Sequence, residues 1–424
     1  MEDPGGKEHS NLTMTTDLHP FANPGRTKLS LVSRGVALPE GLSQPSRWIA
    51  QANAAETVID IRLPSGHFCS VPVGQPYTEK STFQLHEKDD GFHLNCAGEQ
   101  QTVELVEAPS FYSQTTRSGA RMGSFTSLHD KLLILNPLLG CGFFAERGLA
   151  CHYCQYDSML NDVEPPLRDS LDLVEVVRAA LDEREVDTVY LYNGYAPGED
   201  AGLARLVPII ALLRRHLGHR QIALETVAPA DVSVIDELYA AGLDIFVCNL
   251  ELHDELRFAS VCPGKQKHGG QQAIWAALTH ARQIFCEGAV VSHLIPGLEP
   301  LESTVEGMKA LVERGIVPLL VPFRPLPGTA LEHCDLPSLD DVEQALLIQY
   351  ELLTASGIPT HRLRDMGRVL TPMEGRTLVG DAASLRERVK QWGMSGTGRW
   401  LGGVMDKFRR NLRVQQSDSG KGTH

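Results

Sequence analysis

Hydrophobic and polar positions alternate in two different rhythms along this chain, and the rhythm changes near residue 131. The first part contains short strand-like segments at residues 57–63, 82–86, 91–96 and 102–107. Turn-forming residues separate these segments, and Asp90-Gly91 lies between two of them as in a β-hairpin. We therefore expect a small β-rich domain over residues 26–108. A flexible tail over residues 1–25 precedes it, and a polar connector over residues 109–130 follows it.

From residue 131 onwards, apolar segments alternate with helical patterns. The apolar segments lie at residues 131–136, 188–192, 222–225, 245–250, 290–295 and 317–323. The helical patterns between them lie at residues 170–182, 201–216, 229–241, 271–285 and 303–314. Such alternation predicts a parallel sheet with right-handed crossovers, buried on both faces. We expect an α/β fold with a partial (β/α)6 TIM-like barrel over residues 131–335. Its site would lie at the C-terminal ends of the strands.

The remaining sequence predicts a helical C-terminal extension over residues 336–414 and a flexible tail over residues 415–424. Ser338 is the expected N-cap of a helix over residues 338–356. Further helices are expected over residues 381–392 and 400–413. The basic residues of the last segment form either a solvated face or a docking surface for an acidic partner.

Composition narrows the class of protein. The chain has 424 residues, 42% of them hydrophobic and 22% charged, which is enough apolar material for a sizeable core. Its net charge of −14 argues against a general nucleic-acid binder. Apolar runs stay below the roughly 18 residues of a membrane helix, and the first residues do not form a signal peptide. We expect a cytoplasmic protein whose partners include neither nucleic acid nor membrane.

Three of the nine cysteines lie close together in the segment GCGFFAERGLACHYCQY, residues 140–156. Cys141, Cys151 and Cys154 are separated by nine and two residues and follow the first strand of the alternating region. Three thiolates can bind three irons of a [4Fe–4S] cube and leave the fourth iron open. The alternatives are a zinc site with His152 or another residue as the fourth ligand, or a chance grouping of buried thiols. The other six cysteines are expected to be small buried hydrophobic residues.

The position and chemistry of this cysteine segment resemble those of the radical S-adenosylmethionine (radical SAM) enzymes, in particular the biotin-synthase-like branch. Tyr153 matches the aromatic residue that commonly precedes the last cysteine of that family. The usual gaps are three and two residues, so the first gap is expanded here. The resemblance covers residues 131–334 and implies a [4Fe–4S] cluster and S-adenosylmethionine (SAM) as cofactors.

The resemblance also implies SAM contacts at the ends of successive strands. The matching residues are Asn193 and Gly194 after the second strand, Glu225 after the third, Asn249 and Glu251 after the fourth, Gly297 after the fifth and Phe323 after the sixth. A period of two places Asn249 and Glu251 on one strand face. The SAM carboxylate needs a cation, and Arg257 is slightly favoured over Lys265 and Lys267 because a guanidinium contacts a carboxylate at two points.

For the reaction, the resemblance implies reductive SAM cleavage to a 5′-deoxyadenosyl radical, which abstracts hydrogen from a substrate. Tyr192, His293 and Arg324 are the candidate substrate-contacting residues, and Arg324 would bind an anionic group. A small-molecule substrate that undergoes rearrangement, fragmentation, cyclisation or oxidation is favoured. The implied electron donor is a protein such as flavodoxin or ferredoxin. Two alternatives remain: a maturase acting on a protein or metal cofactor, and a non-enzymatic zinc or iron–sulfur protein.

Overall fold

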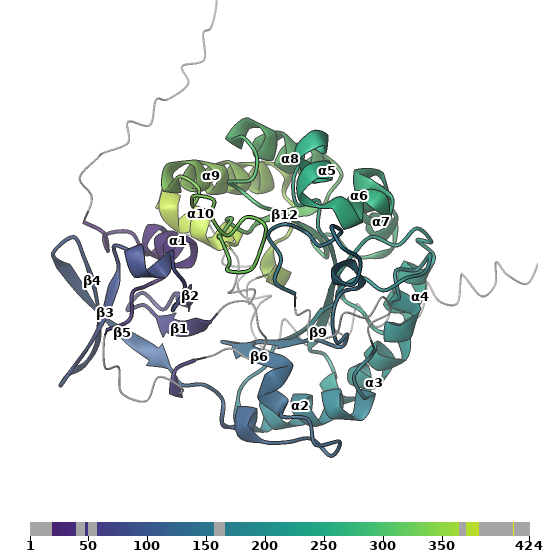
Figure 1. Cartoon of the computed structure of the whole chain (residues 1–424), viewed down its shortest axis with the longest axis horizontal. Helices are drawn as coiled ribbons and strands as arrows, with labels where there is room; N and C mark the ends of the chain where they lie inside the picture. The colour runs from purple at the N-terminus through teal and green to yellow at the C-terminus, as the bar shows by residue number, and fades with distance from the viewer. Residues whose placement is uncertain are drawn as a thin grey trace, which may run out of the picture.

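The N-terminal part of the protein contains a separate antiparallel sheet. The computed structural model describes residues 19–39, 47–49, 57–156, 166–363, 370–380 and 410 (Figure 1). The strands are β1 (Val58–Arg62), β2 (Phe68–Pro72), β3 (Gln84–Lys88), β4 (Gly91–Cys96) and β5 (Glu99–Val106). They pair in the order β2-β1-β5-β4-β3. The hairpin expected around Asp90-Gly91 is confirmed, because β3 pairs antiparallel with β4 from Lys88 and Gly91 onwards.

Helix α1 (Pro24–Arg34) is a correction to the expected tail and strand-like start. The Asn23 side chain accepts hydrogen bonds from the backbone N–H groups of Gly25 and Arg26, and Pro24 occupies the first turn. Leu29 and Val32 are buried in the main core. The capping residues were visible in the sequence. The packing partners that stabilise so short a helix could not be identified from the sequence.

The second sheet has seven strands in the order β12-β11-β10-β9-β8-β7-β6. They are β6 (Thr126–His129), β7 (Leu132–Leu135), β8 (Thr188–Tyr192), β9 (Gln221–Thr226), β10 (Ile245–Cys248), β11 (Val290–Leu294) and β12 (Val317–Leu320). Strands β7 to β12 are parallel to one another, which confirms the six expected strands. Strand β6 lies in the expected connector and pairs antiparallel with β7 through a turn at Asp130.

Helices cover the outer face of this sheet, as the arc in Figure 1 shows. They are α2 (Ser170–Glu183), α3 (Val207–Leu217), α4 (Val234–Ala241), α5 (Glu255–Val261), α6 (Pro263–Lys267), α7 (Gly270–Ile284) and α8 (Leu301–Glu313). Helix α3 begins later than expected, because Gly202 has a left-handed conformation and a 3-10 turn follows it. Among the described residues no helix has the length and apolarity needed to cross a membrane.

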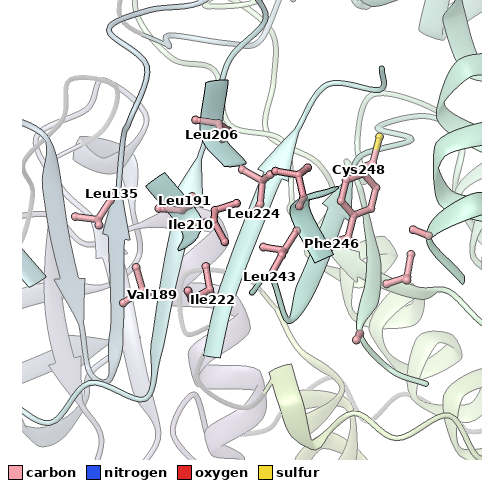
Figure 2. Packing of buried hydrophobic residues seen from close by; sticks show 14 of the residues in the cluster. Leu135, Val189, Leu191, Leu206, Ile210, Ile222, Leu224, Leu243, Phe246 and Cys248 are labelled. Carbon is pink, nitrogen blue, oxygen red and sulfur yellow. The ribbon is translucent and has the colours of Figure 1, made fainter. Parts of the chain in front are cut away.

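Side chains alternate between the two faces of the parallel sheet. Figure 2 shows the face that packs against the helices, with Leu135, Val189, Leu191, Ile222, Leu224, Phe246 and Cys248 among its residues. The opposite face carries Ile134, Tyr190, Ala223, Ile245, Val247, Val291 and Leu319. Because the period is two, Asn249 and Glu251 continue the second set beyond the end of β10. Cys248 belongs to the helix-covered face, as expected.

Helices α9 (Leu339–Ser356) and α10 (Pro372–Val379) follow the last strand. The Ser338 side chain accepts a hydrogen bond from the Asp341 N–H, which confirms the expected N-cap. Leu370 forms a bridge with Leu320 at the edge of β12. The helix expected over residues 381–392 lies outside the described residues. Of the segment 400–413 only Arg410 is described, and it donates to Asp244.

Buried polar groups join the N-terminal sheet to the rest of the molecule. His129 of β6 and Ser70 of β2 both contact the Asp60 carboxylate of β1, at 3.1 and 2.7 Å. Beside them, Lys28 of α1 and Glu374 of α10 form an ion pair at 2.6 Å, and both side chains are at most 6% exposed. We call these five residues the inter-sheet joint.

Candidate active site

A cavity of about 210 Å³ lies at the C-terminal ends of the parallel strands. The sequence-predicted residues that line it are Cys141, Cys151, Tyr153, Cys154, Tyr192, Asn193, Gly194, Glu225, Asn249, Glu251, His293, Phe323 and Arg324. They come from the carboxyl ends of five strands, β8 to β12, and from the cysteine segment that follows β7. Parallel strands bring their carboxyl ends to one edge of a sheet, so residues far apart in sequence meet there.

The segment that carries the cysteines folds back against helices α5 and α6. The His152 N–H donates to the Val261 carbonyl at 2.9 Å, and the Gly264 N–H donates to the Leu149 carbonyl at 3.0 Å. A Cβ atom at Gly264 would lie 2.4 Å from that carbonyl oxygen. The nine-residue gap therefore forms a loop that packs closely on the α5–α6 junction.

Gly194 makes room for the first cysteine. A Cβ atom at this position would lie 2.7 Å from the Cβ of Cys141 and 2.8 Å from the Gly140 carbonyl oxygen. The Gly142 N–H also donates to the Tyr195 carbonyl at 2.8 Å. The turn after β8 and the cysteine loop thus pack backbone against backbone, which only glycine permits.

The three thiols lie in different electrostatic environments. Burial raises the pKa of the Cys141 thiol to about 11, although the Tyr195 N–H donates to its sulfur at 3.3 Å. Burial also raises the pKa of Cys154, whose sulfur accepts from the Tyr156 N–H at 3.2 Å. The pKa of Cys151 is lowered, because a hydrogen bond from Cys262 and the charge of Lys265 outweigh its burial.

Glu225 is held by hydrogen bonds from two neighbouring strands. Tyr190 of β8 donates to one carboxylate oxygen at 2.6 Å, and the Asn249 amide donates to the other at 2.6 Å. The His293 ring lies 3.7 Å from the second oxygen. Carboxylate, amide and imidazole therefore form one connected polar group on the floor of the cavity.

Glu251 and Lys265 form a buried ion pair beside the cysteines. The Lys265 ammonium lies 2.5 Å from the Glu251 carboxylate, and the two side chains are 11% and 6% exposed. Burial works to lower the pKa of Lys265, but Glu251 and the nearby thiols outweigh it and raise that pKa well above its usual value. Glu251 also has φ of 64°, a strained conformation for a residue with a side chain.

At the cavity the Asn193 Oδ1 and the His293 Nε2 are buried without a hydrogen-bond partner. Both residues line the cavity and are at most 7% exposed. A buried polar atom without a partner costs free energy, about 1–3 kcal/mol, so such atoms are typical of sites that a ligand completes.

Arg324 lies where the N-terminal helix meets the site. Its guanidinium donates to the Val32 carbonyl of α1 at 3.2 Å and also lines the cavity. Phe323 and Tyr192 provide aromatic surface nearby. Burial raises the pKa of Tyr192 well above its usual value, so its hydroxyl remains protonated.

Two of the predicted site residues do not line the cavity. Arg257 is exposed on α5 and donates to the Leu298 carbonyl at 3.3 Å. Gly297 packs against Pro337. Lys267, one of the alternatives to Arg257, forms an exposed pair with Glu146. Of the three candidates for the SAM carboxylate, Lys265 is therefore the one that the fold brings to the cavity, because the short helix α6 points only one of its two lysines inward.

Sequence reasoning missed Tyr156 and Cys262. Tyr156 lines the cavity and donates to the Leu138 carbonyl at 3.1 Å. Cys262 was assigned to the scattered hydrophobic cysteines, yet its sulfur lies 4.0 Å from the hydroxyl of Tyr153, a residue that lines the cavity. Its position three residues before Lys265 was the only local signal.

Comparison with known proteins adds a relative and a structural likeness. The chain is 24% identical over 213 residues to the bacteriochlorophyllide c C-7(1)-hydroxylase of Chlorobaculum limnaeum, across 48% of this chain and 52% of the relative. The chain thus spans about half the length of the curated relative that it matches. No family model matches.

Two solved structures show a partial likeness to this chain. Methylornithine synthase (PylB) has a TM-score of 0.41 and 16% identity, covering 52% of this chain and 62% of its own. HydG, a maturase of the [FeFe]-hydrogenase, has a TM-score of 0.41 and 15% identity, covering 51% and 48%.

The residues of this cavity suit the [4Fe–4S] cluster and the SAM that the sequence resemblance implies. Three free thiols line one wall of the cavity. The described side chains contain no set of three or more His, Cys, Asp or Glu arranged around a single metal ion. A [4Fe–4S] cluster requires a different arrangement, in which each of three irons binds one thiolate. Beside the thiols, a lysine and two carboxylates match the charged and hydroxyl groups of SAM.

Proposed function

We propose that this protein is a radical SAM enzyme that acts on a small molecule inside the cavity. The observation that carries the proposal is the meeting of three thiols with Lys265, Glu251, Asn249 and Glu225 at one edge of the parallel sheet. We propose that this open sheet, over residues 131–335, is a partial barrel. Residues 26–108 and 336–414 would be the domains attached to it.

We assign Cys141, Cys151 and Cys154 as the cluster ligands. When bound, the cluster and SAM supply a 5′-deoxyadenosyl radical that takes a hydrogen atom from the substrate. The electron comes from a donor such as flavodoxin or ferredoxin. The protein itself binds and orients the reactants and keeps water away from them.

Lys265 is the proposed partner of the SAM carboxylate, and Asn193 Oδ1 is the proposed acceptor for its amino group. Glu251 and Asn249 face the ribose hydroxyls, which both donate and accept hydrogen bonds. Tyr153 and Phe323 lie at the cavity wall as apolar contacts. Each assignment uses a residue that lines the cavity.

Arg324, His293 and Tyr192 are the proposed substrate residues. A guanidinium at the cavity favours a substrate with a carboxylate or phosphate group. His293 Nε2 has no protein partner and can exchange a proton with the substrate. An oxidation at carbon, among the possible outcomes, is favoured because the curated relative is named as a hydroxylase.

The first experiment is anaerobic reconstitution with iron and sulfide. We expect about four irons and four sulfides per chain, and cleavage of SAM to 5′-deoxyadenosine and methionine under reduction. Cys151→Ser should lose both properties, whereas the buried Cys96→Ser in the N-terminal sheet should keep them. The proposal would be refuted if the protein bound stoichiometric zinc, or if the iron-loaded protein left SAM intact.

The second experiment compares two lysines of helix α6. Each pairs with a glutamate at 2.5 Å, but Lys265 is 11% exposed and Lys267 is 50% exposed. Lys265→Met should weaken SAM binding at least tenfold in calorimetry, and Lys267→Met should leave it unchanged. Equal effects of the two substitutions would contradict the role of Lys265.

The substrate class is tested with a protein-free metabolite extract. The reconstituted enzyme should consume a component of the extract in step with 5′-deoxyadenosine formation, and Arg324→Met should slow that consumption more than SAM cleavage. An extract that stays unchanged while SAM is cleaved would point to a protein or a metal cofactor as the substrate.

A further inference from the structure

Four neighbouring strands of the parallel sheet each contribute one polar residue to a connected series of hydrogen bonds. Tyr190 comes from β8, Glu225 from β9, Asn249 from the end of β10 and His293 from β11. Asn249 and His293 face ligands in the proposed function, whereas Tyr190 and Glu225 have no separate role there. The hydrogen bonds connect these two residues to Asn249 in a fixed order.

Both carboxylate oxygens of Glu225 already accept hydrogen bonds from side chains of the protein. The Tyr190 hydroxyl donates to Oε2 at 2.6 Å, and the Asn249 Nδ2 donates to Oε1 at 2.6 Å. The Glu225 side chain is 14% exposed, and a carboxylate with so little contact with water needs such donors to offset its desolvation. Glu225 therefore connects Tyr190 to Asn249.

The Asn249 amide is fixed at both of its ends. Its Nδ2 donates to the Glu225 carboxylate, which only accepts, and its Oδ1 accepts at 3.2 Å from the His293 backbone N–H, which only donates. Turning the amide over would break both bonds. These bonds use one of its two N–H groups and one of its two lone pairs, so one donor and one acceptor remain for a ligand. A hydroxyl group, which both donates and accepts, matches this pair.

Tyr190 supports this arrangement from beneath the cavity floor. It is 6% exposed and lies between Ile134 of β7 and Ala223 of β9 on the inner face of the sheet. Glu225 and Asn249 line the cavity above it. The Tyr190 hydroxyl is thus linked to the cavity through the Glu225 carboxylate. Loss of this hydroxyl would remove one of the donors that hold the carboxylate and allow it to turn away from Asn249.

We propose that Tyr190 and Glu225 are positioning residues, which hold the Asn249 amide in the orientation that binds a ribose hydroxyl of SAM. Tyr190 acts through Glu225 and does not touch the ligand. This inference rests on the proposed function, since it requires SAM in the cavity with its ribose at Asn249. It adds that the affinity for SAM depends on a hydroxyl beneath the cavity floor.

The test is a double-mutant cycle on the dissociation constant of SAM. The full-length protein is reconstituted anaerobically and kept without reductant, so that SAM stays intact, and calorimetric titration compares the wild type with Tyr190→Phe, Asn249→Ala and the double variant. Asn249→Ala should weaken binding about tenfold and Tyr190→Phe about three- to tenfold, as expected for one hydrogen bond each. The double variant should bind no more weakly than Asn249→Ala, because Tyr190 acts through that amide.

Tyr112→Phe is the matched control. Tyr112 is also a buried tyrosine, 8% exposed, and its hydroxyl accepts from the Leu128 N–H at 2.6 Å. This variant loses a comparable buried hydrogen bond in another part of the core, and it should bind SAM as the wild type does. Weakening of SAM binding by the same factor as in Tyr190→Phe would overturn the inference, because any lost buried hydroxyl would then have this effect.

Two results of the cycle itself would also overturn the inference. One is wild-type affinity in Tyr190→Phe or in Asn249→Ala, and the other is losses that add in the double variant, which would mark an effect of Tyr190 independent of Asn249. If Tyr190→Phe does not fold, Glu225→Gln takes its place in the cycle, because an amide cannot accept from both donors. Additive losses there are equally contradictory. A wild-type protein that binds no SAM would instead refute the proposed function itself.

Discussion

The inter-sheet joint and the cavity both bury charged and polar side chains, but they differ in how completely those groups satisfy one another. In the joint, Asp60 accepts from Ser70 and His129, and Lys28 pairs with Glu374. None of these five residues has a buried side-chain polar atom without a partner. In the cavity, Asn193 and His293 each keep one such atom.

This difference separates structural from functional polar groups. A buried polar network stabilises a fold only when each member has its partners, whereas an unsatisfied atom costs stability. The joint therefore connects two sheets and two helices. The cavity retains unpaired atoms that a ligand can complete. Substitutions in the two regions should have opposite consequences for stability and for function.

The largest expected effect is at the buried ion pair of the joint. Lys28→Met leaves the Glu374 charge without its partner, and the expected loss is about 3–5 kcal/mol in the free energy of unfolding. The double variant Lys28→Met/Glu374→Leu should recover most of this loss. Urea unfolding measures both. Arg26→Met removes a partly exposed pair with Glu343 and should cost under about 1 kcal/mol.

Low pH should remove the stabilisation that the same Lys28–Glu374 pair provides. Burial works to raise the pKa of Glu374, but Lys28 and the hydrogen bonds from Thr371 outweigh it, so the pKa is lowered below 4.5. A lowered folded-state pKa contributes stability above the unfolded value, and this contribution is lost as pH falls through the folded value. The wild type should therefore lose stability below about pH 4.5 more steeply than Glu374→Gln. Parallel unfolding curves for the two proteins would contradict this.

His293 tests the cavity, which is the second region of the comparison. His293→Leu removes the Nε2 atom, which has no protein partner, and the Nδ1 atom, which lies 3.7 Å from Glu225. Its cost in the free energy of unfolding should therefore stay well below that of Lys28→Met. Substrate turnover should fall about 100-fold if the ring transfers a proton. A large loss of stability with normal turnover would place His293 with the structural group.

The smallest expected effect is at Asn193. Asn193→Ala removes the unpaired Oδ1 and should leave the melting temperature unchanged. The dissociation constant of SAM should rise about tenfold, which corresponds to one lost hydrogen bond of about 1.4 kcal/mol to a charged group. Calorimetric titration with SAM measures it. Unchanged affinity would show that this atom does not face the amino group.

Much of the parallel sheet could be predicted because each strand and helix carries its own periodicity. The alternation of side chains along β10 placed Asn249 and Glu251 on one face and Cys248 on the other, and the structure agrees. The capping residues of α1 were also present in the sequence. Its helical state was missed because eleven residues are marginal without tertiary packing, and the partners of α1 lie in helices α9 and α10.

The sequence by itself determined the three cysteines, the six parallel strands and which side chains share a strand face, since these depend on local spacing. Only the tertiary structure decided that Lys265 and not Arg257 reaches the cavity, and that Cys262 lies beside Tyr153. Both outcomes depend on how the junction of α5 and α6 packs on a loop more than a hundred residues earlier. Local periodicity carries no information about such a contact, because it arises from the packing of separate elements.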